Sequence, residues 1–270
     1  MSYIRLDYVD LLAAGSLILL NGALSVALQL GLERQLAIAT ARMIVQLLLV
    51  GLVLTTLFAL VSPLWTGIAA LAMVLFAGRE IMARQERRLA GIWAYGLGTG
   101  CMLVAAGLVT LFALTTQVSP EPWYDPRYAL PLLGMILGNT MTGISLGLHT
   151  LTTGLFRDRA AVEARLSLGA TRREAMLPVM RGALRSALMP IVNAMAATGL
   201  VSLPGMMTGQ ILAGVEPEQA VKYQILIMFL IAGGTGLGAV AAVVAGSYRL
   251  SDRRHRLRLD RLATTREPRK

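Results

Sequence analysis

The sequence has little charge, and it is poor in the residues that build disulfides, metal clusters and phosphate-binding loops. Only 15% of its 270 residues are charged, whereas a soluble domain carries about a quarter. The single cysteine, Cys101, excludes a disulfide within the chain, and with two histidines it makes no Cys/His metal framework. Lysine occurs only at Lys222 and Lys270, and neither ends a Gly-x-x-x-x-Gly-Lys motif, so the chain has no phosphate-cradling loop of that kind.

Catalytic motifs are also missing. The sequence has no His-Glu-x-x-His pattern and no pair of carboxylates inside an apolar run. A Gly-x-Ser-x-Gly pattern occurs at residues 143–147, with His149 one turn beyond Ser145. A nucleophile elbow needs a strand-turn-helix setting and an orienting acid, and this copy lies in an uncharged run with neither. The pattern therefore indicates helix packing, and we expect a chain without catalytic groups.

Long uncharged runs dominate what is present. Hydrophobic residues make up 56% of the chain, and each uncharged run is long enough for at least one helix of about 20 residues across the hydrocarbon core of a bilayer. Lipid permits only helices or closed barrels, and alternating strand patterns are absent. We predict an all-α polytopic membrane protein with about seven spans, near residues 9–31, 35–60, 64–82, 91–116, 129–153, 185–213 and 222–247.

The distribution of basic residues predicts the orientation of the chain in the membrane. If the loop around 157–185 is cytoplasmic, every arginine and lysine except Arg5, Arg127 and Lys222 lies on that side. The positive-inside rule then predicts a multi-pass protein of the inner (cytoplasmic) membrane, with its N-terminus outside and its C-terminus inside. We expect residues 1–248 to form the transmembrane domain and residues 249–270 a solvated or lipid-touching basic cytoplasmic tail. The net charge of +10 thus indicates topology and membrane lipid as a partner, and no nucleic acid.

Residues 157–185 are the long cytoplasmic connector. Gly169 follows a short helical pattern and fits the position just past a helix end. Thr171 followed by Glu174 fits a capping box at the start of the next helix. The sequence predicts a short helix, a Gly-Ala turn, and a second helix that leads into the sixth span. From the residues alone, a solvated connector and a docking element are equally good interpretations.

The sixth uncharged run, 186–215, is too long for one straight span. It would extend roughly 45 Å as a helix, well beyond the hydrocarbon core. Pro204 lacks a backbone donor and Gly205 tolerates unusual dihedral angles, so we predict a break at 202–207. Whether the two methionines there bind a metal, close a gate or only pack is open. The candidates for lining a pathway or gate are Ser202, Pro204, Gly205, Met206, Met207, Gln210, Asn139 and Asn193.

Two segments carry a resemblance to known transporters. Glu163-Ala-x-x-x-x-Gly169-Ala resembles the EAA-type coupling loop of ABC transporter permeases. Leu166-Ser-Leu-Gly-Ala-Thr171 and the segment 199–224 closely resemble the FetB-type iron-export permease family, to which plant aluminium-tolerance permeases are related. The resemblance extends over nearly all the spans and is most specific across 163–224.

The resemblance implies a non-catalytic permease subunit that exports iron or another metal ion, is coupled to a separate cytoplasmic ABC ATPase through residues 160–173, and forms a homodimer in the membrane. ATP and magnesium would bind the ATPase, so this chain needs no cofactor of its own. A stand-alone secondary carrier and a non-transporting scaffold or sensor stay open as alternatives; the carrier would ordinarily place ionisable residues within the spans for ion coupling. The residues that would contact the ATPase are Glu163, Ala164, Leu166, Leu168, Gly169 and Ala170.

Overall fold

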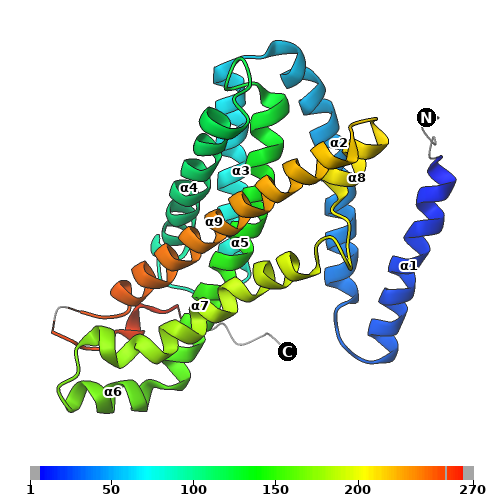
Figure 1. The fold of residues 1–270 in the computed structure, drawn as a ribbon. Coiled ribbons are helices and arrows are strands. Elements are labelled where there is room, and N and C mark those ends of the chain that lie inside the picture. Colours follow the sequence, from blue (N-terminus) through cyan, green and yellow to red (C-terminus); the bar gives the residue numbers. More distant parts are fainter. Residues whose placement is uncertain (1–6, 253, 264–270) are drawn as a thin grey trace. The chain divides into compact units, whose positions relative to one another are not determined.

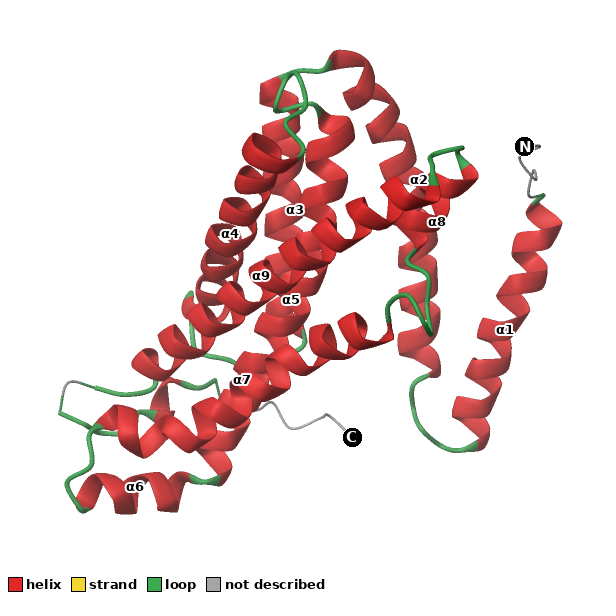
Figure 2. Cartoon of the chain, in the orientation of Figure 1, coloured by secondary structure: helices red, strands yellow, loops and turns green. Residues whose placement is uncertain are grey.

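The computed structural model describes residues 7–252 and 254–263. Within these residues the protein is helical, with nine α-helices, one π-helical turn, one 3-10 turn and only isolated β-bridges (Figures 1 and 2). Seven of the described helices are long and apolar enough to cross a membrane. The prediction of an all-α chain with about seven candidate spans is confirmed. The sidedness of the termini stays a prediction.

The chain divides into two compact units, Met1–Leu60 and Val61–Lys270. The first unit is a helical hairpin of α1 (Tyr8–Ala27) and α2 (Glu33–Leu60). Ser25 closes its turn, since its hydroxyl donates to the Glu33 carboxylate at 2.9 Å and accepts the Leu32 N–H at 3.0 Å. Most apolar side chains of the hairpin are exposed, as expected of a surface that meets lipid or another protein.

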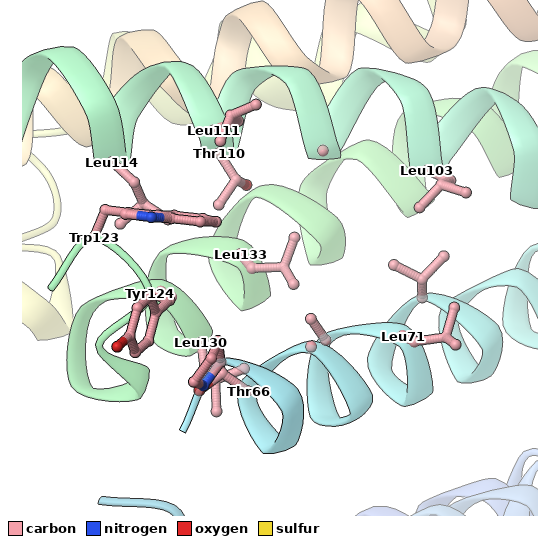
Figure 3. Close-up of a pocket in the computed structure, with 16 residues that line it drawn as sticks. Thr66, Leu71, Leu103, Thr110, Leu111, Leu114, Trp123, Tyr124, Leu130 and Leu133 are labelled. Atoms are coloured by element: carbon pink, nitrogen blue, oxygen red, sulfur yellow. The ribbon is translucent and has the colours of Figure 1, made fainter. Parts of the chain in front are cut away.

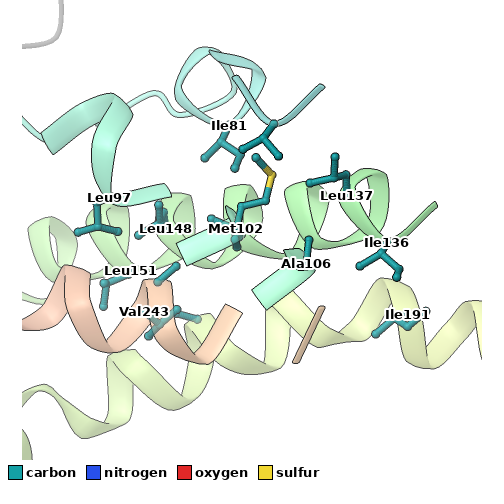
Figure 4. Close-up of a cluster of buried hydrophobic side chains, with 14 of the residues drawn as sticks. Ile81, Leu97, Met102, Ala106, Ile136, Leu137, Leu148, Leu151, Ile191 and Val243 are labelled. Atoms are coloured by element: carbon teal, nitrogen blue, oxygen red, sulfur yellow. The ribbon is translucent and has the colours of Figure 1, made fainter. Parts of the chain in front are cut away.

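The second unit is a bundle around α5. That central helix contacts four long helices of the bundle, and side chains from several of them form the buried core shown in Figure 4. The helices are α3 (Pro63–Ala83), α4 (Trp93–Phe112, followed by a π-helical turn, Ala113–Gln117), α5 (Pro126–Arg157), α6 (Arg159–Ser167), α7 (Arg172–Ala197), α8 (Gly205–Leu212) and α9 (Pro217–Arg249).

Small residues let α5 and α9 approach closely. A Cβ atom at Gly238 would lie 2.6 Å from Thr140 Cγ2, and one at Gly143 would lie 2.7 Å from Thr235 Cγ2. Any larger residue at these positions would push the two helices apart, which is the role that small residues have between membrane helices. These glycines therefore pack the bundle internally.

One end of the bundle is fastened by arginine–aromatic contacts. Three guanidinium groups lie 3.6–4.8 Å from ring centroids, Arg87 over Phe156, Arg249 over Trp93, and Arg172 over Tyr248. Each contact joins a different pair of segments at the end where α5 and α9 finish and α4 and α7 begin. Cation–π contacts of this kind add of order 1 kcal/mol each.

The described part of the C-terminal tail packs on this same end, a contact that the prediction of a solvated or lipid-touching tail did not include. Leu250 is fully buried, and the tail leucines 257, 259 and 262 pack against the core. The Ala90 N–H donates to the Arg261 carbonyl at 2.8 Å. The leucines spaced between the arginines give the tail an apolar face. The prediction missed this face because it considered only the number of basic residues in the tail. Residues 264–270 of the predicted tail lie outside the described residues.

The predicted sixth span, 185–213, consists of two helices and starts too late. The capping box at Thr171 begins α7 at Arg172, and α7 then continues for 26 residues through Pro178 and Pro190. The predicted connector, 157–185, is therefore mostly helix; only Asp158 and residues 168–171 lie outside helices. The start of this helix therefore follows the capping box at Thr171 and not the beginning of the uncharged run near residue 185.

Candidate functional site

The turn after α6 is a Schellman motif. The Ala170 N–H donates to the Arg165 carbonyl at 3.0 Å, and the Gly169 N–H donates to the Leu166 carbonyl at 3.1 Å. Gly169 has φ +91°, and a Cβ there would meet nothing within 4 Å. Glycine is therefore required by the backbone conformation and not by crowding. The predicted helix-ending role of Gly169 is confirmed.

The start of α7 is capped from two directions. The Glu174 carboxylate accepts the Thr171 N–H at 2.8 Å, and the Thr171 hydroxyl accepts the Glu174 N–H at 3.4 Å, which confirms the capping box. In addition, the Arg172 N–H donates to Nδ1 of His255 at 2.9 Å, so the tail supplies a further acceptor. The His255 contact could not be predicted from local patterns, because the two residues lie far apart in the chain.

One face of α6 anchors it to the bundle. Val162 is 1% exposed, and Leu166 and Ala170 are half-buried against the core. Nη1 of Arg165 also donates to the Ala175 carbonyl of α7, at 3.4 Å. Two of the six residues predicted to contact an ATPase, Leu166 and Ala170, thus pack at least partly on the bundle itself.

The other side of the connector points outward. Leu168 is 87% exposed, and Ala164 and Gly169 are exposed as well. Glu163 is half-buried, and its carboxylate pairs with Arg159 one turn earlier, at 2.8 Å. An apolar side chain held outward beside a charged pair, on a rigid turn, is a surface suited to a protein partner.

The other end of α7 is a break. After Ala197 the chain leaves the helix, turns at Gly199 with φ +95°, and closes a short loop in which the Gly199 N–H donates to the Ser202 carbonyl at 2.9 Å. Helix resumes at Gly205. The predicted break at 202–207 exists but lies at 198–204, since Pro204 lacks an N–H and suits the position before a helix start. Gly205, Met206 and Met207 are the first turn of α8.

The break is poorly covered. The last buried side chain of α7 is that of Ile191, which is 6% exposed. Every residue from 192 to 196 is exposed. Leu200 and Val201 in the loop are 95% and 84% exposed. An apolar segment this open needs lipid or another chain to cover it.

The predicted pathway residues near the break do not gather at one point. Ser202 is exposed in the loop, whereas Met207 is 8% exposed and Met206 is half-buried against the core. The Gln210 side-chain oxygen is buried and has no hydrogen-bond partner. Among the described residues no group of three His, Cys, Asp or Glu side chains could hold a metal ion.

A second orphaned amide lies on the neighbouring helix. Gln224 of α9 is 6% exposed, and its Oε1 atom also lacks a partner. Because α8 packs against α9, both glutamines belong to one helical hairpin. A buried carbonyl oxygen without a partner is a ready acceptor or cation ligand. Sequence reasoning missed Gln224, although it ends the 199–224 segment that carries the resemblance.

Asn139 lies on a polar stripe of α5. Asn139, Thr142, His149 and Thr153 follow at helical spacing on a face that is exposed or half-buried. The side-chain NH₂ group of Asn139 donates to the Met135 carbonyl at 2.9 Å, and the side-chain oxygen of Asn139 takes no part in this hydrogen bond. Sequence reasoning did not find this stripe, because it treated each polar residue singly.

Asn193 lies at a corresponding level on α7. The two helices run antiparallel, since a Cβ at Gly154 would meet Val179 and one at Gly143 would meet the Ala187 carbonyl. The same register brings the level of Asn139 to the last turns of α7, where Asn193 is exposed.

A separate apolar cavity of about 360 Å³ lies between α3, α4 and α5, beside Trp123 and Tyr124 (Figure 3). The hydroxyls of Thr66 and Thr110 are buried there without hydrogen-bond partners, and the remaining lining is almost wholly apolar. Such a lining suits an acyl chain or an apolar solute and offers a metal ion few ligands.

The sequence matches the profile of the uncharacterised protein family UPF0014 over residues 8–250, which covers nearly all of the described helices. The chain belongs to the UPF0014 family. Its curated relatives are named as membrane proteins, and with seven candidate spans the UPF0014 chain is a multi-pass membrane protein.

Three relatives show the breadth of the UPF0014 family. The membrane protein slr1647 of Synechocystis is 40% identical over 91% of this chain and 94% of its own length. The probable iron export permease protein FetB of Escherichia coli is 32% identical over 85% of this chain and 86% of its own. Protein ALUMINUM SENSITIVE 3 of Arabidopsis thaliana is 32% identical over 85% and 82%. The resemblance drawn from residues 163–224 is confirmed. No solved structure matches this chain.

Proposed function

We propose that this chain is the permease subunit of an ATP-driven transporter, coupled to a separate ATPase through residues 160–173, and that it exports iron or another metal ion. The observation that carries the proposal is the connector between α5 and α7. Its short helix is anchored by Val162, ends in a Schellman turn, and holds Leu168 outward at 87% exposure.

The geometry of the connector suits force transmission. A partner that pushes on Leu168 pushes on a turn whose backbone groups are bonded on both sides of Gly169. The displacement then passes into α7, because the Thr171 cap and the Arg165–Ala175 hydrogen bond join α6 to it. A loosely solvated connector would absorb the same push by bending.

The energy source lies outside this chain in our proposal. The sequence has no phosphate-cradling glycine-lysine motif, so ATP and magnesium would bind the partner subunit. The chain would then be a non-catalytic part of an ATP-hydrolysing complex.

We place the transport path beside the α5 stripe and the break. An asparagine exposed to hydrocarbon is costly, so Asn139 and Asn193 should face water or a second copy of the chain. A homodimer that joins these faces would line a path with amide oxygens and hydroxyls. The break at 198–204 would then act as the gate that α7 moves.

The substrate class follows from the relatives and from the donors. FetB is named as a probable iron export permease. Amide and hydroxyl oxygens such as those of Asn139 and Gln210 suit hard cations better than the thioethers of Met206 and Met207 do. The export direction rests on the family relationship.

A matched pair of exposed leucines tests the coupling. Leu168 and Leu200 lie beyond opposite ends of α7 and are 87% and 95% exposed. The Leu168→Asp variant should lose the co-purifying ATPase and ATP-dependent metal uptake into inside-out vesicles. The Leu200→Asp variant should keep the ATPase, because it lies outside the connector.

The alternatives predict other outcomes. A secondary carrier would move metal without ATP and would be indifferent to Leu168→Asp. A scaffold or sensor would lose its partner in that variant but would move no substrate in either. Retention of the ATPase by Leu168→Asp would refute the coupling surface.

A further inference from the structure

A second cavity lies between the start of α7 and the end of α9. It has a volume of about 320 Å³, and two of its lining residues, Arg172 and Arg173, lie at the C-terminal edge of the 160–173 connector. Its α7 wall runs from Arg172 to Leu184, and its other wall is formed by residues 244–248 of α9 and by Ser251 just beyond that helix. The lining includes three arginines and three apolar residues, Arg172, Arg173, Arg181, Met180, Leu184 and Val244.

The rim of the cavity is strongly positive. Arg172, Arg173 and Arg181 line it, and none of its described lining residues is acidic. None of the three arginines takes part in the ion pairs found among the described residues. The nearest acid along the chain, Glu174, is engaged in the capping box.

Arg172 is held at the rim. Its guanidinium carbon lies 4.5 Å from the centre of the Tyr248 ring, and its backbone N–H is bonded to His255. A guanidinium that is already oriented loses less conformational entropy when it meets an anion. Arg173 and Arg181 are exposed and free to close on the same anion.

The walls become apolar away from this rim. Met180 is 9% exposed and Leu184 and Val244 are half-buried, so they form the inner wall of the cavity, while Arg173 and Arg181 are exposed at its mouth. The α5 and α9 helices are about 48 and 50 Å long at 1.5 Å per residue, against a hydrocarbon core of roughly 30 Å, so their arginine-bearing ends extend into the headgroup layer. The cavity therefore has a cationic rim at headgroup depth and an apolar interior.

We propose that this cavity is a binding site for an anionic phospholipid. The phosphate would bind between Arg173 and Arg181, beside Arg172, and the first part of an acyl chain would lie along Met180 and Leu184. Guanidinium groups match phosphate oxygens in bidentate geometry. With the predicted sidedness the site faces the cytoplasmic leaflet, where anionic lipid is available. An acidic protein segment would satisfy the arginines but would leave the apolar interior unfilled.

Lipid retention by the purified full-length protein tests the site. Native mass spectrometry would follow dioleoyl phosphatidylglycerol against dioleoyl phosphatidylcholine as the lipid is titrated. The Arg173→Gln/Arg181→Gln variant should bind phosphatidylglycerol roughly thirtyfold more weakly, as expected for two lost surface charges. Phosphatidylcholine binding should not change.

Two further variants serve as controls. Arg84→Gln/Arg88→Gln removes the same charge from exposed positions at the same end of the bundle, outside the cavity, and should bind phosphatidylglycerol like the parent protein. Arg173→Lys/Arg181→Lys keeps the charge and should lose much less affinity than the glutamine variant. Both also report whether the fold tolerates substitution of surface arginines.

Three results would overturn the proposal. Equal loss of lipid in both glutamine variants would mean a general charge effect. Displacement of phosphatidylglycerol by glycerol 3-phosphate at similar concentrations would mean a phosphate site without a role for the acyl chain. Loss of a co-purifying ATPase in Arg173→Gln/Arg181→Gln with unchanged lipid retention would assign the cavity to a protein partner.

Discussion

The two ends of α7 are built in opposite ways. At its start, the Thr171 capping box, the His255 acceptor and the Schellman turn at Gly169 bond the backbone groups on both sides of the turn. At its end, backbone bonds also close the loop, since the Val201 and Ser202 N–H groups donate to the Ala197 carbonyl, but residues 192–196 are exposed and Leu200 is 95% exposed. One helix thus joins a rigid connector to a weakly packed loop.

This difference indicates how one helix could carry motion. Local stability follows the number of buried contacts and protected hydrogen bonds, so the two ends should open with very different free energies. A push at the rigid end would move α7 as a body, and the weakly packed end would change conformation first. Hinges are commonly a few residues at the ends of elements.

The largest effect is expected from a variant that stiffens the weakly packed loop at the end of α7. The Pro204→Ala/Gly205→Leu variant restores a backbone donor and a helix-forming residue, so helix can extend back into the loop. A Cβ at Gly205 would meet nothing within 4 Å and the residue is exposed, so the first side-chain atom has open space. Metal transport in vesicles should fall by about tenfold or more if the loop is the moving part.

Membrane insertion and ATPase co-purification of that variant should match the parent protein. The single variant Gly209→Leu is the matched control, because it also lies in α8, with open space at its Cβ, but leaves the loop unchanged. Transport at the parental rate by the double variant would show that the loop does not need to move.

A pair of glycines sharpens the comparison at the level of stability. Gly169 and Gly199 have φ +91° and +95°, and neither would bring a Cβ within 4 Å of another atom. Alanine at either position meets only the strain of the left-handed conformation, about 1–2 kcal/mol. Backbone hydrogen bonds surround both glycines. The connector at Gly169 is also anchored by the buried Val162, which limits relaxation, whereas Leu200 and Val201 beside Gly199 are exposed and leave that loop room to adjust.

Thermal unfolding in detergent would measure the difference. Gly169→Ala should lower the midpoint by roughly 2–8 °C, since about 1 kcal/mol corresponds to a shift of 2–4 °C in a chain of this size. Gly199→Ala should lower it by a smaller amount. Equal shifts would mean that the break is as firmly held as the connector.

Local signals in the sequence predicted the connector well. Gly169, Thr171 and Glu174 act through their nearest neighbours in the chain, so their spacing is sufficient to place the turn and the helix start. The helices themselves follow from apolar runs, because a bilayer fixes both their composition and their length. The break was also predictable from Pro204, although its position was four residues too late at its start.

Contacts between distant segments were not predictable in this way. The folded tail depends on leucines that meet residues near Leu89, and His255 reaches Arg172 across the chain. The pathway candidates were chosen by residue type, and only the antiparallel register of α5 and α7 relates Asn139 to Asn193. A single sequence carries no record of which distant faces meet.

The smallest expected effect is in the C-terminal tail, which packs only on the end of the bundle where α7 starts and should stabilise that end in a pH-dependent way. The Asp252 carboxylate accepts the backbone N–H groups of Arg256 at 2.8 Å and Arg254 at 2.9 Å, and these bonds lower the pKa of Asp252 below its ordinary value. A lowered folded-state pKa means that the stabilisation is complete above the unfolded pKa and is lost as the pH falls through the folded one.

Hydrogen exchange in residues 254–263, corrected for the intrinsic rate, should therefore lose protection only at acid pH, while the loop at 198–204 shows no matching change. Asp252→Asn should remove most of that pH dependence, whereas Asp260→Asn, whose carboxylate binds the Arg258 side chain, should leave the part due to Asp252 in place. An unchanged acid transition in Asp252→Asn would show that another group holds the tail against the start of α7.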